Sequence, residues 1–406
     1  MKRILYITYD GLSDPLGQSQ ILPYIKGLAA QGYQFTILSF EKKDRYLRQK
    51  EILQNLTKES NIDWVPLWFT SKPPLLSKFY DTVKMRLTAM QLQKKKHFDM
   101  VHCRSYIAAD AGLYMKKKFG IKFFFDMRGF WADEKKDGGS WNMDNPIFKR
   151  VYRYYKEKER DYLQNADYII SLTTAGKKEM LTWPYYNEQI PIGIIPCCAD
   201  MNHFTLTDPN QKEKGREILN ITQDKLVLSY LGSLGTWYMI DEMLKLFKKI
   251  KNVYDNAFFL FVTPSDPQLI LSRLATYDLQ EVDLKIIEAL RPEVPLYIKA
   301  SDINISFIKP VYSKLSSSPT KLGEVLSMGI PVISNSGVGD VETIINEING
   351  GFVFHQFSED EYEQLINYLP MLLNKNPSEI RDKAVAIYSL SKGIDLYSQC
   401  YKSLLN

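Results

Sequence analysis

The sequence predicts an α/β protein with two doubly wound parallel sheets, one after the other along the chain. Short apolar runs typical of buried strands alternate with segments of helical periodicity over the 406 residues, which favours parallel strands with helices on both faces. This alternation starts again after residues 190–204, and the length of the chain suits two domains. We therefore expect an N-terminal domain at residues 1–190 and a second domain at residues 191–377.

The expected strands are four to nine residues long and rich in branched and aromatic side chains, as buried strands are. In the first domain we expect strands at 3–8, 34–40, 99–103, 121–127 and 167–172. In the second domain we expect strands at 225–233, 257–263, 284–289, 303–308, 330–335 and 351–355. Ligands of such sheets bind at the carboxyl ends of the strands, and with two domains the cleft between them is the expected site.

Composition and cysteine use favour a cytoplasmic protein without a metal site. The chain is 45% hydrophobic and 24% charged, as ordinary globular proteins are, and no run is long enough to span a membrane. The first apolar run ends at Tyr9 and Asp10, too early for a signal peptide. The four cysteines form no CxxC pair and have no metal-ligand spacing.

Charge is divided unequally along the chain. Residues 1–190 hold 32 Lys and Arg against 21 Asp and Glu, a balance of +11, whereas residues 191–406 hold 20 against 26, a balance of −6. The basic half can be drawn to an anionic membrane, a polyphosphate or a nucleic acid. A lysine-rich surface that is simply solvated is the alternative, and both interpretations stay open.

The segment 72–96 is basic and has helical periodicity. Its apolar stripe consists of Leu76, Phe79, Tyr80, Val83, Leu87 and Met90. Such a helix can lie on an anionic membrane, or it can be a crossover helix whose apolar stripe packs on the sheet. Of these two interpretations, the sequence favours the crossover helix.

The segment 316–335, SSSPTKLGEVLSMGIPVISN, has the pattern of a helix, a stop and a buried strand. Pro319 suits the first helical position, and Gly329 suits the left-handed residue that ends a helix. A polar stripe beside the apolar face consists of Thr320, Lys321 and Glu324. The N–H groups of the first turn and Lys321 can bind a diphosphate, while Glu324 can accept hydrogen bonds from a ribose. A surface pair of Lys321 with Glu324 is the alternative.

Glycine-containing loops follow the first strand of each expected domain. The loop at 10–19 contains Gly11, Gly17 and Gln18, and the loop at 232–235 contains Gly232, Ser233 and Gly235. Backbone N–H groups in such loops, followed by a helix N-terminus, can hold an anion or a sugar hydroxyl. A tight turn is the alternative for each loop taken alone. Finding the same device in both domains favours ligand binding.

A further polar group follows the very hydrophobic strand at 121–127. We expect Asp126, Arg128 and Asp133 to lie at the carboxyl end of this strand, where Trp131 can stack on a sugar. His102 lies at the end of another expected strand, 99–103. A capped loop with exposed charges, or a histidine that only forms structural hydrogen bonds, is the alternative.

Several stretches together resemble glycosyltransferase family 4, whose members have the GT-B fold. SSSPTKLGEVLSMGIPVISNSGVGDVETII resembles the donor-nucleotide motif, LGSLGTWYMIDEML the phosphate loop, and FDMVHCRS the strand and loop beside the cleft. YDGLSDPLGQSQILPYIKGLAAQGY resembles the opening strand, loop and helix. These matches follow in order along most of the chain, which makes the resemblance specific.

The resemblance implies two facing Rossmann-like domains, with the acceptor bound by the first and the donor by the second. It implies a final segment, 378–406, that returns to the N-terminal domain. It also implies a retaining transferase, without metal or other cofactor, that moves a hexosyl or N-acetylhexosaminyl group from a UDP- or GDP-linked donor. The implied acceptor is a glycan or polyprenyl-linked precursor of a surface polysaccharide, used at the inner face of the cell membrane.

The resemblance also implies roles for individual residues. In the second domain, Gly232, Ser233, Gly235, Arg291, Ser316, Pro319, Thr320, Lys321 and Glu324 would bind the donor, with Glu324 on the ribose. In the first domain, His102, Asp126 and Arg128 would be catalytic. The acceptor side would be formed by Gly11, Gly17, Gln18, Trp131 and Asp133.

Two departures from the family pattern remove charge from the donor site. Ser316 stands where the motif often has a second glutamate, and Ser233 stands where the phosphate loop often has an arginine. No lysine follows in the loop before Asp241. The candidates to replace the missing cations are Arg291, Lys309, Lys314 and Lys321.

Two other classes of function stay open. One is a different GT-B enzyme, such as a nucleotide-sugar epimerase, which needs no acceptor. The other is a non-catalytic or degenerate protein that binds a sugar nucleotide. The sequence contains no recognisable nucleic-acid module, so no nucleic-acid partner is expected, and neither domain opens with the dinucleotide fingerprint of NAD enzymes.

Overall fold

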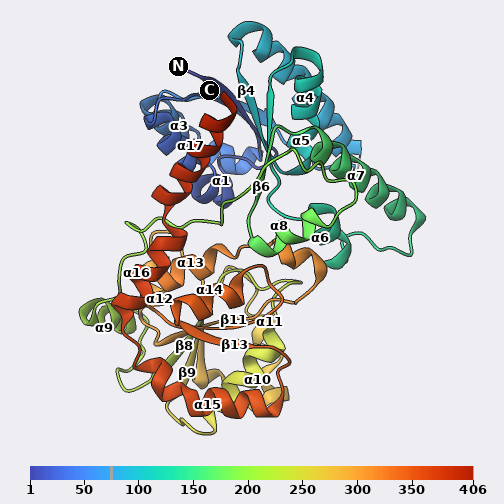
Figure 1. Cartoon of the computed structure of the whole chain (residues 1–406). Helices are drawn as coiled ribbons and strands as arrows, with labels where there is room; N and C mark the ends of the chain where they lie inside the picture. Colours follow the sequence, from blue (N-terminus) through green and yellow to red (C-terminus); the bar gives the residue numbers. More distant parts are fainter. Residues whose placement is uncertain (74–75, 406) are drawn as a thin grey trace. The chain divides into compact units, whose positions relative to one another are not determined.

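The computed structural model describes residues 1–73 and 76–405, which form two compact units (Figure 1). The first unit combines Met1–Pro196 with the segment that begins at Leu390, and the second unit is Cys197–Ser389. No helix within the described residues is long and apolar enough to cross a membrane.

The first unit is built on a seven-stranded parallel sheet in the order β3-β2-β1-β4-β5-β6-β7. Its strands are β1 Arg3–Thr8, β2 Gln34–Glu41, β3 Asp63–Trp68, β4 Met100–Arg104, β5 Lys122–Asp126, β6 Tyr168–Ser171 and β7 Ile192–Ile194. Two of these strands, β3 and β7, were not expected from the sequence. Both lie at edges of the sheet, where strands are only partly buried and therefore lack a continuous apolar run.

Helices cover both faces of this sheet. They are α1 Pro15–Gln20, α2 Leu22–Ala30, α3 Lys43–Glu59, α4 Leu76–Lys96, α5 Ser105–Phe119, α6 Trp131–Asp137, α7 Pro146–Asn165, α8 Thr174–Leu181 and α17 Leu390–Leu405. The helix α5 approaches the sheet closely at Gly112. A Cβ added at Gly112 would lie 2.4 Å from the sulfur of Cys103, so only glycine fits there.

The helix α4 buries the face opposite to the one that the sequence suggested. It packs against α5, but with a stripe of Ser77, Asp81, Met85, Ala89 and Gln93. The apolar stripe points to solvent, and Phe79 is 69% exposed. The expectation that the apolar stripe packs on the sheet is therefore wrong. Hydrogen bonds make the polar face viable, because Asp81 accepts from the hydroxyl of Tyr9 and the N–H of Thr70.

The second unit is built on a six-stranded parallel sheet in the order β10-β9-β8-β11-β12-β13. Its strands are β8 Leu226–Leu231, β9 Ala257–Val262, β10 Leu284–Ile287, β11 Ile303–Ser306, β12 Val332–Asn335 and β13 Gly351–Phe354. Each coincides with a strand expected from the sequence. The helices are α9 Pro209–Ile218, α10 Ile240–Lys251, α11 Gln268–Leu271, α12 Val294–Lys299, α13 Thr320–Ser327, α14 Val341–Ile348, α15 Glu359–Leu373 and α16 Pro377–Tyr388.

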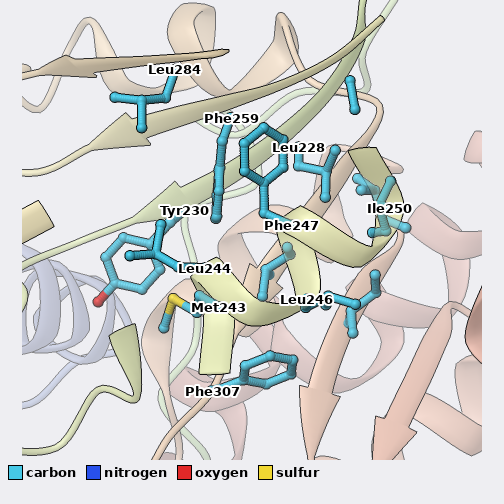
Figure 2. Packing of buried hydrophobic residues seen from close by; sticks show 14 of the residues in the cluster. Leu228, Tyr230, Met243, Leu244, Leu246, Phe247, Ile250, Phe259, Leu284 and Phe307 are labelled. Atoms are coloured by element: carbon cyan, nitrogen blue, oxygen red, sulfur yellow. The ribbon is translucent and has the colours of Figure 1, made fainter. Parts of the chain in front are cut away.

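Apolar cores lie on both faces of the second sheet, as a doubly wound sheet requires. On one face, Phe247 of α10 packs against Phe259 of β9, with ring centroids 5.2 Å apart (Figure 2). On the other face, α13 contributes Leu322, Val325 and Leu326 to a second cluster. This burial fixes α13 on the sheet and so determines where its polar stripe lies.

The boundary between the units differs from the expected one by a few residues. The strand β7 pairs with β6, so the first sheet extends beyond residue 190. The final segment, expected at 378–406, is divided. Its first helix, α16, packs on α13 of the second unit, whereas α17 packs on α2 of the first. Residues 74–75 of the segment 72–96, and residue 406, lie outside the described part.

Candidate functional site

The donor-site candidates of the second unit gather where β8 ends and α13 begins. Gly232 follows β8 directly and has φ +116°, a conformation that favours glycine. A Cβ at this position would lie 2.8 Å from the Nζ of Lys321. Two segments far apart in the sequence therefore meet at Gly232, and a side chain there would displace the lysine.

Lys321 is held by two aromatic rings. Its Nζ lies 3.8 Å from the ring centroid of Tyr238 and 4.6 Å from that of Tyr230. It also donates a hydrogen bond of 3.2 Å to the Tyr230 hydroxyl. Burial lowers the pKa of Lys321 to about 7, and the Glu324 carboxylate only partly opposes this shift. The amine is therefore poised between its charged and neutral forms near neutral pH.

Glu324 lies one turn further along α13 and is 7% exposed. Burial raises the pKa of its carboxyl group, although Arg291 acts in the opposite direction. The Nη1 of Arg291 donates to the Oε1 of Glu324 at 3.4 Å. The side chain of Arg291 is 43% exposed, so this pair lies at the surface of the unit. The carboxylate is thus held in place by a partner that a ligand can reach.

The N-terminus of α13 suits an anion better than that of α10. Pro319 is the N-cap residue of α13, no side chain caps the helix, and its first turn contains no acidic residue. The first turn of α10 contains Asp241 and Glu242, which disfavour an anion. The helix α13 begins at Thr320, one residue later than expected. Pro319 contributes no N–H donor, because proline has none.

The other donor-site candidates are placed as follows. Ser233 and Gly235 are exposed, and a Cβ at Gly235 would meet nothing within 4 Å, so space does not require glycine there. Thr320 is half-buried at the start of α13. Ser316 is buried, and its hydroxyl donates to the carbonyl oxygen of Ser313 at 3.0 Å.

The four residues that could replace the missing cations of the phosphate loop lie in different surroundings. Lys309 is exposed, Lys314 lies 3.8 Å from the ring centroid of Trp237, and Arg291 pairs with Glu324. Lys321 is the candidate placed against Gly232 itself. Tyr230 and Tyr238, which hold it, were missed at the level of sequence. Tyr230 lies within an apolar strand and could not be distinguished there from a core residue.

In the first unit, charged residues lie at the carboxyl ends of neighbouring strands. Arg104 ends β4 and donates to Asp10 at 3.4 Å, while Arg128 follows β5 and lies 3.9 Å from Asp126. Ser105 and Arg128 have φ of +66° and +59°, which is unusual for residues other than glycine. Such strain often marks a functional site, so this edge of the sheet remains the candidate acceptor side.

His102 and Asp126 form a buried network with the last helix. The Nδ1 of His102 contacts the Tyr401 hydroxyl, and its Nε2 lies 3.5 Å from the Oδ2 of Asp126. The Tyr397 hydroxyl donates to the same Oδ2 at 2.9 Å. His102 is 2% exposed. Its contacts bind α17 to the sheet, and its catalytic role stays a prediction.

Within this network the His102 side chain is neutral and the Asp126 side chain is charged. Burial lowers the pKa of His102, and the neighbouring Asp126 only partly compensates. Burial alone would raise the pKa of Asp126, but Arg128 and His102 together hold it below its usual value. The pair therefore consists of an imidazole and a carboxylate at neutral pH.

The loop after β1 is held by Glu41, which the sequence did not single out. This buried carboxylate ends β2 and accepts hydrogen bonds from the N–H groups of Leu12 at 2.7 Å and Ser13 at 3.1 Å. A Cβ at Gly11 would lie 2.6 Å from Glu41, and one at Gly17 would lie 2.1 Å from the carbonyl oxygen of Gly11. Both glycines are therefore needed for a tight turn.

The remaining acceptor-side candidates lie among other side chains. Gln18 donates to the side chain of Gln49. Asp133 is buried, and it accepts hydrogen bonds from the Tyr152 hydroxyl at 2.6 Å and Lys156 at 3.0 Å. Trp131 is half-buried, and its ring centroid lies 4.8 Å from that of Tyr155. Asp133 is thus not an exposed charge at the strand end, because α7 covers it.

Comparison with known proteins identifies the family. The model described as Glycosyltransferase Family 4 matches residues 20–203, and the model described as Glycosyl transferases group 1 matches residues 211–384. The chain belongs to the family 4 glycosyltransferases. The two models together span both structural units, so the chain is a glycosyltransferase.

Solved structures confirm the fold over the full chain. Sucrose-phosphate synthase from Thermosynechococcus elongatus is similar with a TM-score of 0.75 and 15% identity, covering 100% of this chain and 99% of that one. HepE from Anabaena, in complex with UDP and glucose, has a TM-score of 0.71 and 12% identity, covering 100% of both chains. WaaG, a glycosyltransferase involved in lipopolysaccharide biosynthesis, has a TM-score of 0.65 and 15% identity, covering 97% and 99%.

These glycosyltransferase neighbours show that the two parallel sheets form a GT-B fold. At such low identity the likeness shows the fold and no individual residue role. No protein with a curated description matches the chain.

Proposed function

We propose that the protein is a retaining glycosyltransferase that takes its sugar from a nucleoside diphosphate sugar bound to the second unit. The observation that carries the proposal is the stripe of α13, which places Lys321 against Gly232 and Glu324 one turn further in. The diphosphate binds at the N-terminus of α13 and Lys321, and the ribose hydroxyls donate to Glu324.

The chemistry that we propose needs charge stabilisation more than acid–base catalysis. When the glycosidic bond to the diphosphate breaks, negative charge develops on the leaving oxygen. The N–H groups of α13 and the Lys321 ammonium stabilise that charge from fixed positions. The proposal includes a donor linked to UDP or GDP and no bound metal. A neighbour solved with UDP-glucose supports a nucleotide-sugar partner.

For the acceptor we propose a glycan or a polyprenyl-linked precursor of a surface polysaccharide, bound by the first unit. Arg104, Asp126 and Arg128, at the carboxyl ends of β4 and β5, are the candidate residues on this side. The similarity to a transferase involved in lipopolysaccharide biosynthesis supports this acceptor class. A polyprenyl-linked acceptor would require the protein to work at the inner face of the cell membrane.

The exposed face of α4 supports this peripheral position. Leu76, Phe79, Tyr80, Val83 and Leu87 are between 37% and 69% exposed. They lie opposite the buried stripe of the helix, since residues advance by about 100° along an α-helix. Lys84, Lys94 and Lys95 lie on the same helix, and no ion pair of theirs is found in the described part of the chain. An apolar stripe beside lysines fits an anionic bilayer.

Liposome flotation tests the membrane contact. We expect the protein to float with vesicles of anionic phospholipid, and Phe79→Ser with Leu87→Ser to abolish flotation without loss of fold. Ile52→Ser, at another exposed apolar residue of the first unit, is the matched control. Equal flotation of all variants, or none of the wild type, would exclude α4 as the contact.

Thermal unfolding with nucleotides tests the donor site. The ligands are UDP, GDP, CMP, ADP, dTDP and NAD, each with and without EDTA. A ligand at a hundred times its Kd adds about 2.7 kcal/mol, which raises the Tm by several degrees. We expect one nucleoside diphosphate to stabilise the protein in EDTA, Glu324→Ala to remove the shift, and the exposed control Glu363→Ala to retain it.

The outcomes separate the functions that the sequence left open. A diphosphate that stabilises the protein, followed by sugar transfer to an acceptor, supports the transferase. An epimer formed without acceptor would identify a nucleotide-sugar epimerase. No shift with any nucleotide would mean that Ser233 and Ser316 mark a donor site that has lost its function.

A further inference from the structure

Lys321 differs from the other cations of the second unit in what surrounds it. The rings of Tyr230 and Tyr238 lie within cation–π distance of its Nζ, and its hydrogen bond goes to a neutral hydroxyl. Among the described residues, no carboxylate forms an ion pair with it. A charged amine in this position lacks a contacting counter-ion until a ligand supplies one.

The titratable groups around Lys321 come from three elements. On α13 itself, Glu324 is the acidic residue that acts on the amine, but its carboxylate contacts Arg291, which precedes α12. The strand β8 and the loop after it contribute only Tyr230 and Tyr238. Burial raises the pKa of the Tyr230 hydroxyl, so this group stays neutral and donates no charge.

We propose that Lys321 is the cation that replaces the missing charges of the phosphate loop, and that it takes up one proton when a nucleoside diphosphate binds. This inference rests on the proposed donor site. Its geometric basis is the position of Nζ against Gly232, at the N-terminus of α13, between two neutral rings. A diphosphate there adds negative charge beside an amine that no carboxylate of the described residues contacts.

The protonation balance follows directly. Burial sets the pKa of the amine at about 7 in the absence of ligand, so above neutral pH most molecules carry –NH2. Binding then combines the neutral amine, one proton from solvent and the nucleotide to give an ammonium–diphosphate pair. An adjacent anion favours the charged form of a lysine, so the pKa of Lys321 rises in the complex.

This coupling predicts a steep pH dependence of affinity. Between pH 7.5 and 8.5 the nucleotide's phosphates are ionised and its base still carries its ring N–H proton, so the dependence in this range reports on the protein. We expect the affinity for the diphosphate to fall by roughly eightfold between pH 7.5 and 8.5. We expect uridine or guanosine, which lack the diphosphate, to show no such dependence.

Isothermal titration calorimetry with UDP and GDP tests the proposal. Titrations at pH 8 in two buffers of different ionisation enthalpy give the number of protons taken up, which we expect to be close to one. Lys321→Arg stays charged at every pH, so it should bind without proton uptake and without the steep pH dependence. Lys321→Met should bind weakly at every pH. Lys214→Met, at an exposed lysine of α9, is the control and should behave as wild type.

The outcomes distinguish this inference from the proposed function. If neither diphosphate binds at pH 6.5 or pH 8, the donor site itself is refuted. If a diphosphate binds with no proton uptake and with an affinity that is constant between pH 7.5 and 8.5, the donor site stands and the role of Lys321 is overturned. Should Lys321→Met fail to fold by circular dichroism, the wild type and Lys321→Arg still decide.

Discussion

Removing one hydroxyl from α17 should destabilise the first unit by a measurable amount. In Tyr397→Phe the ring stays, so the aromatic contacts with Tyr24 and His102 are retained. The change removes the donor of a 2.9 Å hydrogen bond to the Oδ2 of Asp126. Asp126 is 1% exposed, and its Oδ1 has no hydrogen-bond partner among the described residues. The carboxylate then keeps the contact with His102 at 3.5 Å and the ion pair with Arg128 at 3.9 Å.

The expected cost follows from the charge of the acceptor. A hydrogen bond to a buried charged group contributes about 1.5–3 kcal/mol, so Tyr397→Phe should lower the free energy of unfolding by about 2 kcal/mol. For a unit of this size that corresponds to a loss of several degrees in Tm. Urea unfolding followed by circular dichroism measures the change. Tyr80→Phe, at an exposed tyrosine of α4, is the matched control.

A double variant tests the reasoning itself. If the hydroxyl acts through the charge of Asp126, then the effect of Tyr397→Phe should shrink by at least half in an Asp126→Asn background. A change within about 0.5 kcal/mol of the control, or full additivity of the two substitutions, would show that the network does not hold α17 in place.

Three further predictions concern other residues. Because burial lowers the pKa of His102 below its unfolded value, the folded state should lose stability as pH falls below about 6.5, and His102→Gln should flatten a plot of unfolding free energy against pH in that range. Gly232→Ala should weaken nucleoside diphosphate binding at least tenfold in calorimetry, because its Cβ would displace Lys321; an unchanged Kd would contradict this. Glu41→Ala should cost about 2 kcal/mol in urea unfolding, because buried N–H groups of the first loop lose their acceptor, whereas the exposed control Glu51→Ala should cost less than about 0.5 kcal/mol.

The sequence alone predicted the strands of the second unit, but it did not predict the edge strands of the first unit. Strands such as β8 and β9 are buried on both faces, so they read as continuous apolar runs. The edge strand β3 is only partly buried and contains Pro66, so it lacks that pattern. The family resemblance predicted a donor motif at Glu324 from the fixed spacing of residues along one helix, and this stays a prediction.

The contacts of individual candidates could not be predicted in the same way. The meeting of Lys321 with Gly232 depends on how α13 packs beside β8, which no local pattern encodes. The buried face of α4 could not be predicted for a similar reason, because hydrogen bonds to Asp81 made its polar face the buried one. Periodicity shows that a helix has two faces, but tertiary contacts decide which face is covered.

The division of the chain has a consequence for the order in which the units are made. The second unit is one continuous segment, Cys197–Ser389, whereas α17, which contacts His102 and Asp126, is translated after it. Proteins generally fold domain by domain from the N-terminus during synthesis. Here the second unit is synthesised completely before the first unit is. Until the end of translation the N-terminal sheet lacks α17, and the surface that binds this helix stays uncovered. Chains that end at Ser389 and are released from the ribosome should therefore be more protease-sensitive in the first unit than in the second.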